Sequence, residues 1–176
     1  MLTWDTRLFF MINHLPHPGI MDWFFGLFWS MKLWIMPIVL GSLWLLWKGK
    51  TRGRRVVITL VLSVGLADLT AYRLIKPRVN RIRPCFEQPD VITPMGLPGG
   101  GRSFPSNHAA NTAALAGSLI HWSSAAGFGG AGMALLVGFS RVYHGVHYPL
   151  DVITGWLLGW GLSVIIWRIT VTLHHE

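Results

Sequence analysis

The chain has 176 residues, of which 52% are hydrophobic and 12% are charged, and its formal net charge is +8. A soluble domain carries roughly 25% charged residues, so this composition excludes an ordinary water-soluble protein and indicates a membrane protein of one domain. The positive charge alone would fit nucleic acid as a partner, but the long apolar segments favour the lipid bilayer instead.

Residues 3–30 are apolar but interrupted. Pro16, Pro18 and Gly19 separate two short apolar segments. Such a break favours two amphipathic helices at the membrane interface, or a short hairpin that dips into the bilayer. A complete membrane span in this region is the less favoured alternative.

Five apolar segments follow, covering about residues 33–47, 56–76, 106–122, 127–143 and 149–171. Roughly 20 helical residues cross an apolar core of about 30 Å. We therefore predict an all-α fold, a polytopic membrane helix bundle of about five to six transmembrane helices with an N-terminal interfacial amphipathic segment. Gly155 and Gly159 predict close helix packing. Asp68 lies within a predicted span, so we expect it to pair with a cation such as Arg73 or to line a polar path.

The charges predict an orientation in the membrane. Five cations fall within residues 48–55, between the first two long segments, and the positive-inside rule places this loop in the cytoplasm. Alternate crossings then put residues 77–105 and residues 140–151 on the extracytoplasmic face. The unusual polar residues lie in these stretches. They are therefore expected to form one site on the outer side of the cytoplasmic (inner) membrane.

The first polar stretch is a cluster of cations: Arg73, Lys76, Arg78, Arg81 and Arg83. Snorkelling at a helix end is the favoured interpretation of Arg73, Arg78 and Arg81. A cationic cluster on the outer face nevertheless runs against the positive-inside rule, so we expect an anion to balance it. Phosphate fits best, because the guanidinium fork matches its oxygens.

The second polar stretch begins a helix. Ser106 is predicted to be the N-cap, which places Asn107 and His108 in the first turn. Capping alone is enough to explain Ser106. The unpaired N–H groups of a helix start also form an anion site, and an imidazole there could give a proton to a leaving oxygen.

The third polar stretch precedes the last long segment and contains Arg141, His144, His147 and Asp151. Asp151 could stabilise the helix dipole from the first turn. Alternatively, it could accept a hydrogen bond from one ring nitrogen of His147 while the other nitrogen attacks. Arg141 would add a phosphate contact. His144 could support the residues that bind the phosphate, but the favoured interpretation places it at the membrane interface.

Together these stretches resemble the signature of the type 2 phosphatidic acid phosphatase family, which shares its site with vanadium haloperoxidases and bacterial acid phosphatases. The three parts of the signature, in their family order, are Lys76-x6-Arg83-Pro84, Pro105-Ser-Asn-His108 and Ser140-Arg141-x5-His147-x3-Asp151. The resemblance covers residues 76–151 and the flanking spans. Asn107 departs from the commonest pattern, which has glycine, but its backbone N–H is retained.

This resemblance implies a metal-independent membrane phosphatase that acts on lipid phosphates through a phosphohistidine, without a cofactor. His147 would be the nucleophile and Asp151 its orienting partner, while His108 would serve first as acid and then as base. Phosphate binding would fall to Lys76, Arg83, Arg141, Ser106 and Asn107. One domain, residues 1–176, would thus combine the interfacial segment, residues 1–30, with a catalytic bundle, residues 31–176.

The signature is common to phosphatases of undecaprenyl diphosphate, lipid A, phosphatidylglycerophosphate and phosphatidate. Small size and short loops favour the first two, with undecaprenyl diphosphate slightly ahead. A phosphate-binding membrane carrier is an alternative of another class, which would need the cations but not the two histidines and the aspartate. A haloperoxidase is disfavoured by the membrane composition. The sequence leaves the oligomeric state open.

Overall fold

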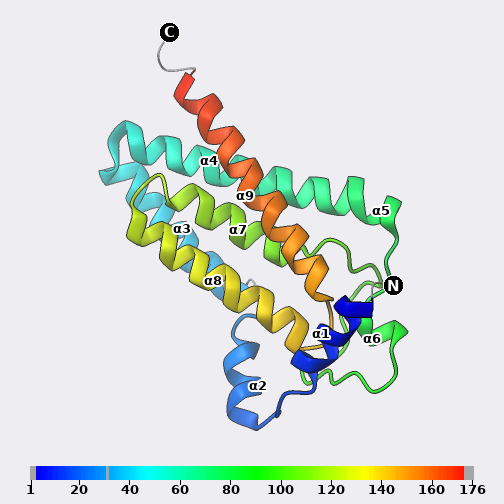
Figure 1. Ribbon diagram of the computed structural model, residues 1–176. Coiled ribbons are helices and arrows are strands. Elements are labelled where there is room, and N and C mark those ends of the chain that lie inside the picture. Colours follow the sequence, from blue (N-terminus) through cyan, green and yellow to red (C-terminus); the bar gives the residue numbers. More distant parts are fainter. Residues whose placement is uncertain (1–2, 31, 173–176) are drawn as a thin grey trace.

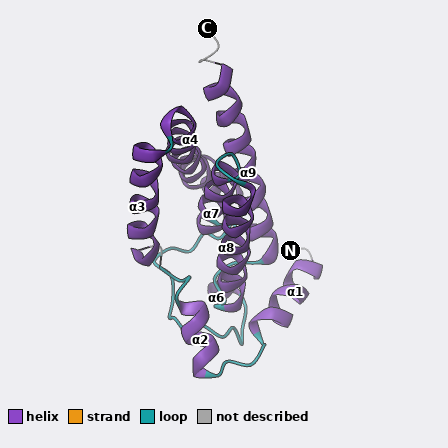
Figure 2. Cartoon of the chain, turned by 90° about the vertical axis from the view of Figure 1, so that its left-hand side faces the viewer, coloured by secondary structure: helices purple, strands orange, loops and turns teal. Residues whose placement is uncertain are grey.

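The computed structural model describes residues 3–30 and 32–172. The ends of the predicted domain, residues 1–2 and 173–176, lie outside the described residues. Helices and loops make up the described part of the chain, in which the only β-type pairing is an isolated bridge between Ile82 and Arg102 (Figure 2). The predicted all-α class is confirmed.

The helix bundle is built around one short central helix. Its members are α3 (Lys32–Lys48), α4 (Lys50–Leu69), α7 (Asn107–Leu119), α8 (Ser124–Tyr143) and α9 (Pro149–Thr172) (Figure 1). The central helix α7 packs against α4, α8 and α9. Its sequence is rich in alanine and its buried face consists of small residues, which let three neighbouring helices approach it closely.

Among residues 3–30 and 32–172, three helical stretches are long and apolar enough to cross a membrane: Lys50–Val79, Ser124–Tyr143 and Pro149–Thr172. The first comprises α4, the π-helix η1 (Thr70–Ile75) and α5 (Lys76–Val79). At 17 and 13 residues, α3 and α7 are shorter. The predicted multi-pass membrane bundle is confirmed, whereas its count of five to six spans stays a prediction.

The basic stretch of residues 48–55 is mostly helical, not a loop as expected from the sequence. Gly49 alone separates α3 from α4. A Cβ atom on Gly49 or Gly53 would lie 2.4 or 2.2 Å from the carbonyl oxygen of Leu45. The two glycines therefore allow the helices to form a tight hairpin, which carries the cations on its turn.

Residues 3–30 form two short helices, α1 (Thr3–Asn13) and α2 (Gly19–Gly26). At 11 and 8 residues, neither is long enough to cross a bilayer, in agreement with the predicted interfacial pair. Helix α1 is nevertheless part of the bundle, because Asp5, Phe9 and Asn13 are buried along one face. It lies near α6 (Pro84–Glu87) and the start of α9 (Figure 1).

Two glycines allow α9 to cross α7 at close range. A Cβ atom on Gly155 would lie 2.6 Å from the carbonyl oxygen of Ser106, and one on Gly159 would lie 1.9 Å from that of Ala110. No larger residue fits without moving the backbone. The predicted close packing at these glycines is confirmed, and it brings the starts of α7 and α9 together.

Replacing Gly159 by Ala should lower the melting temperature in detergent, because the new methyl group must displace α7, at a cost of roughly 1–3 kcal/mol. Gly161 provides the control, since no neighbouring side chain or packed helix lies within 4 Å of the place that a Cβ atom would take there. At this position the same change should leave the melting temperature unchanged or raise it, because alanine has a higher helix propensity than glycine. The melting temperatures are measured by circular dichroism. An equal decrease in melting temperature at the two positions would contradict the close-approach explanation.

Candidate active site

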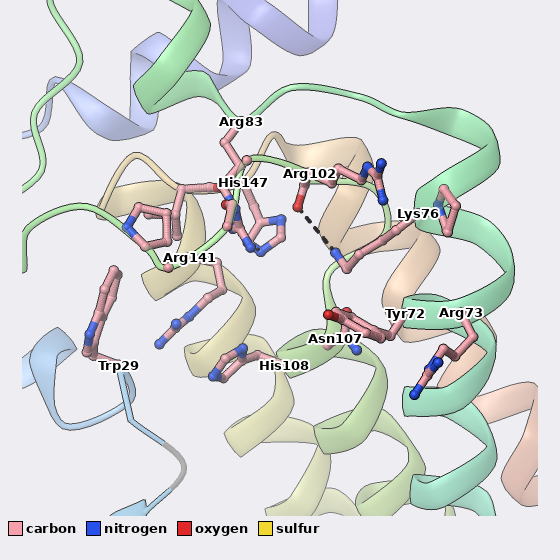
Figure 3. Close-up of a pocket in the computed structure, with 16 residues that line it drawn as sticks. Trp29, Tyr72, Arg73, Lys76, Arg83, Arg102, Asn107, His108, Arg141 and His147 are labelled. Atoms are coloured by element: carbon pink, nitrogen blue, oxygen red, sulfur yellow. Dashed lines mark hydrogen bonds between the residues drawn. The ribbon is translucent and has the colours of Figure 1, made fainter.

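The three polar stretches meet at one cavity of about 720 Å³ (Figure 3). Its wall is formed by the end of the α4–η1–α5 helix, the loop of residues 98–102, the start of α7 and the segment between α8 and α9. Six of the eight predicted site residues line it: Lys76, Arg83, Asn107, His108, Arg141 and His147. The other two, Ser106 and Asp151, are fully buried nearby.

Lys76 is held by the loop that leads into α7. It follows η1 directly, and π-helical turns often occur at functional sites. Its ammonium group donates to the carbonyl oxygens of Pro105 at 2.7 Å, Ser103 at 3.3 Å and Arg102 at 3.5 Å. The side chain therefore fixes the loop while it contributes a positive charge to the cavity.

Arg83 contacts the predicted nucleophile. Its Nη1 donates to the carbonyl oxygen of Val146 and to Nε2 of His147, both at 2.9 Å. A guanidinium group cannot accept a hydrogen bond, so Nε2 of His147 is the acceptor and carries the lone pair. Burial, together with the positive charges of Arg83, Lys76 and Arg141, holds the pKa of His147 well below its ordinary value near 6.5.

Asp151 lies on the other side of the His147 ring. One of its oxygens is 3.5 Å from Nδ1 of His147, which is longer than a normal hydrogen bond. The same oxygen accepts a hydrogen bond from the backbone N–H of Tyr148, and the second oxygen accepts one from Arg81, both at 2.9 Å. The snorkelling interpretation of Arg81 is therefore wrong, because its side chain is only 13% exposed.

Ser106 caps α7 as predicted. Its hydroxyl oxygen accepts a hydrogen bond from the backbone N–H of Ala109 at 3.4 Å, and its own N–H donates to the carbonyl oxygen of Asp151 at 2.9 Å. Capping places His108 and Asn107 in the first turn, where both face the cavity (Figure 3). Phosphate binding by Ser106 stays a prediction.

Arg141 and His144 pack against Trp29, a residue that the sequence did not single out. The Arg141 guanidinium donates to the carbonyl oxygen of Phe28 and lies 4.9 Å from the Trp29 ring centre. His144, expected at the membrane interface, is fully buried, with its ring edge-on to Trp29. Burial and the charge of Arg141 lower the pKa of His144 to about 4, so its ring is neutral near pH 7.

Asp68 belongs to the surroundings of the site. Its carboxylate accepts hydrogen bonds from the side-chain amides of Asn107 at 2.7 Å and Asn111 at 3.4 Å. The expected pairing with Arg73 is replaced by these amide contacts, while Arg73 lines the cavity. Asp68 therefore holds the side chain of Asn107, the residue that departs from the common family pattern.

Comparison with known proteins decides the family. The model of the PAP2 superfamily matches residues 56–174, which is more than half of the chain. The chain belongs to the PAP2 superfamily. This confirms the resemblance to type 2 phosphatidic acid phosphatases that the three motifs indicated.

Individual PAP2 proteins match much of the chain. It is 28% identical to the lipid A 4'-phosphatase of Bacteroides thetaiotaomicron, over 98% of this chain and 81% of that protein. It is 35% identical to the undecaprenyl-diphosphatase of Sulfolobus acidocaldarius, over 64% of this chain and 52% of that protein. The crystal structure of Aquifex aeolicus LpxE matches with a TM-score of 0.76 and 26% identity, covering 95% of this chain and 96% of that one.

The protonation of His147 can be measured directly. In NMR spectra of labelled protein in micelles, its ring should titrate well below pH 6.5, because the buried ring is surrounded by cations. Arg83→Gln removes one of these charges and should shift the midpoint to higher pH. The signal is assigned by its loss in a His147→Ala variant. A wild-type midpoint at or above pH 6.5 would contradict the predicted environment.

Proposed function

We propose that this protein is an integral membrane phosphatase that hydrolyses a lipid phosphate or diphosphate at the extracytoplasmic face through a phosphohistidine. PAP2 membership and relatives named as lipid phosphatases support a phosphatase. One observation supports His147 as the nucleophile. Its Nε2 faces a cationic cavity while its Nδ1 lies beside the buried carboxylate of Asp151.

The charge of the cavity favours a phosphate group. The described residues that line it include five cations and no carboxylate: Arg73, Lys76, Arg83, Arg102 and Arg141. A phosphate group offers each guanidinium fork two oxygens. When Arg83 turns its fork to those oxygens, Nε2 of His147 loses its hydrogen bond and its lone pair becomes available for attack.

In the proposed first step, Nε2 of His147 attacks phosphorus and forms a P–N bond. The bond from phosphorus to the bridging oxygen breaks, its electron pair stays on that oxygen, and His108, protonated in the complex with the anionic phosphate, supplies the proton. Water then attacks the phosphohistidine, His108 takes the proton of the water, and the P–N electrons return to Nε2 as inorganic phosphate leaves. Asp151 stabilises the positive imidazole ring of the intermediate.

The proposed mechanism requires no metal ion. Lys76, Arg83 and Arg141 line the cavity, where their charges can stabilise the transition state as Mg²⁺ does in other phosphoryl-transfer enzymes. No cofactor is needed, because both steps are acid–base and nucleophilic chemistry. The proposed partners are therefore the lipid substrate and the bilayer.

The positions of the cations support an extracytoplasmic site. The basic turn between α3 and α4 lies at the opposite end of α4 from α5 (Figure 1). If this turn is cytoplasmic, as the positive-inside rule predicts, the cavity beside α5 opens on the outer side of the inner membrane.

The relatives support two substrate classes. The lipid A 4'-phosphatase matches nearly the whole chain, whereas the undecaprenyl-diphosphatase matches about two thirds of it. We therefore place a lipid A phosphate ahead of undecaprenyl diphosphate, reversing the order expected from chain size and loop length.

His147→Ala should reduce phosphate release at least a thousandfold, in line with the roughly 10⁴- to 10⁶-fold losses seen when one member of a catalytic triad is removed. An acid-labile ³²P adduct should form on the wild-type protein and be absent from the variant. His121→Ala is the control, because this ring lies at the other end of the bundle, stacked on Trp167. Undiminished turnover by His147→Ala would refute the mechanism. If the wild-type protein binds the lipid phosphate but releases no inorganic phosphate, a carrier is favoured.

Substrate class and metal independence can be tested together in detergent with EDTA. We expect unchanged turnover after chelation, inhibition by vanadate, and a higher kcat/KM for lipid A than for undecaprenyl diphosphate. Phosphatidate and phosphatidylglycerophosphate complete the panel. Activity that is lost in EDTA and restored by a divalent ion would contradict the proposed charge stabilisation.

A further inference from the structure

Helix α1 reaches the active-site carboxylate through one arginine. Arg81 donates from Nη1 to Oδ1 of Asp151 at 2.9 Å and from Nη2 to Oδ2 of Asp5 at 2.5 Å. The second oxygen of Asp5 accepts the backbone N–H of Leu150 at 2.9 Å. Asp5 thus contacts both the guanidinium group that binds Asp151 and the helical turn on which Asp151 lies.

This bridge is buried. The side chains of Asp5 and Asp151 are 0% exposed, and that of Arg81 is 13% exposed. The guanidinium group also lies 3.9 Å from the centre of the Tyr148 ring. In a site that water reaches so little, charges interact strongly and the sum of the nearby charges matters.

The charges show what Asp5 adds. A single carboxylate paired with Arg81 would form a neutral pair, so Asp151 alone would present little net charge to His147. With Asp5 the group contains two carboxylates and one guanidinium, so its net charge is negative, and one oxygen of Asp151 lies 3.5 Å from Nδ1 of His147. That charge is what stabilises a positive imidazole ring.

We propose that Asp5 is a positioning residue of the active site, which acts through Arg81 to hold Asp151 in place and to keep the net charge of the Asp5–Arg81–Asp151 group negative beside His147. This proposal rests on the proposed function. It extends the site beyond the PAP2 match, which begins at residue 56.

Contacts other than those of Asp5 also anchor α1 to the bundle. The amide of Asn13 donates to the carbonyl oxygens of Ile92 and Tyr143, both at 2.8 Å, and its oxygen accepts the N–H of Ile92 at 2.9 Å. Phe9 is buried and packs edge-on against Tyr148, with ring centres 5.3 Å apart. Removing the charge of Asp5 should therefore leave α1 docked.

The test is a double-mutant cycle of Asp5→Asn and Arg81→Gln, measured as phosphate release in detergent. Asp5→Asn should lower kcat on the order of tenfold with KM changed less than twofold, and it should slow formation of the ³²P adduct equally. In the Arg81→Gln background the same change should have no further effect, because Asp5 acts through Arg81. Asp22→Asn removes a carboxylate bonded to His17 and Tyr143, and should leave kcat unchanged.

An equal loss from Asp5→Asn in both backgrounds, or an unchanged kcat, would overturn the proposal. If Asp5→Asn does not fold, Arg81→Lys replaces it. This change keeps the positive charge but removes the guanidinium group that bonds both carboxylates. We therefore expect the same loss of kcat, and a wild-type kcat would overturn the proposal. An inactive His147→Ala beside a fully active Asp5→Asn rejects only this inference, whereas an active His147→Ala rejects the proposed function itself.

Discussion

The candidate active site depends on the contact between the starts of α7 and α9. The backbone N–H of Ser106 donates to the carbonyl oxygen of Asp151 at 2.9 Å, and Gly155 leaves room for this approach. His108 lies in the first turn of α7 and His147 lies just before α9. Because rigid helices carry or flank both histidines, one crossing fixes the proposed acid and the proposed nucleophile relative to each other.

The described residues that line the cavity include several cations and no carboxylate, so other groups are needed to offset the repulsion. Backbone carbonyl oxygens do this here. Lys76 donates to three of them, Arg83 donates to those of Gly100 and Val146, and Arg141 donates to that of Phe28. These dipoles compensate part of the lost hydration without neutralising the charge. The cations can therefore stay close together and still attract an anion.

The sequence was sufficient to predict the helical bundle, the cap at Ser106 and the gathering of the signature residues. These features depend on apolar segments, turn chemistry and motif spacing, which are local properties. The contacts of Arg81 could not be predicted, because its partners lie about 70 residues away in either direction along the chain. The burial of His144 against Trp29 was missed for the same reason, since spacing alone does not reveal which helix covers a side chain.

The residues proposed to react with the substrate therefore differ in predictability from the residues that hold Asp151 in place. The residues proposed to touch the substrate fall within residues 76–147, where a recurring phosphate chemistry constrains both residue type and spacing. The support of Asp151 requires only that some buried anion share Arg81 with it, and that anion can come from any segment that packs nearby. In this chain it comes from Asp5 on α1. The interfacial helix is thus fastened to the same helical turn as the proposed catalytic carboxylate, and its packing and the net charge beside His147 are linked through one guanidinium group.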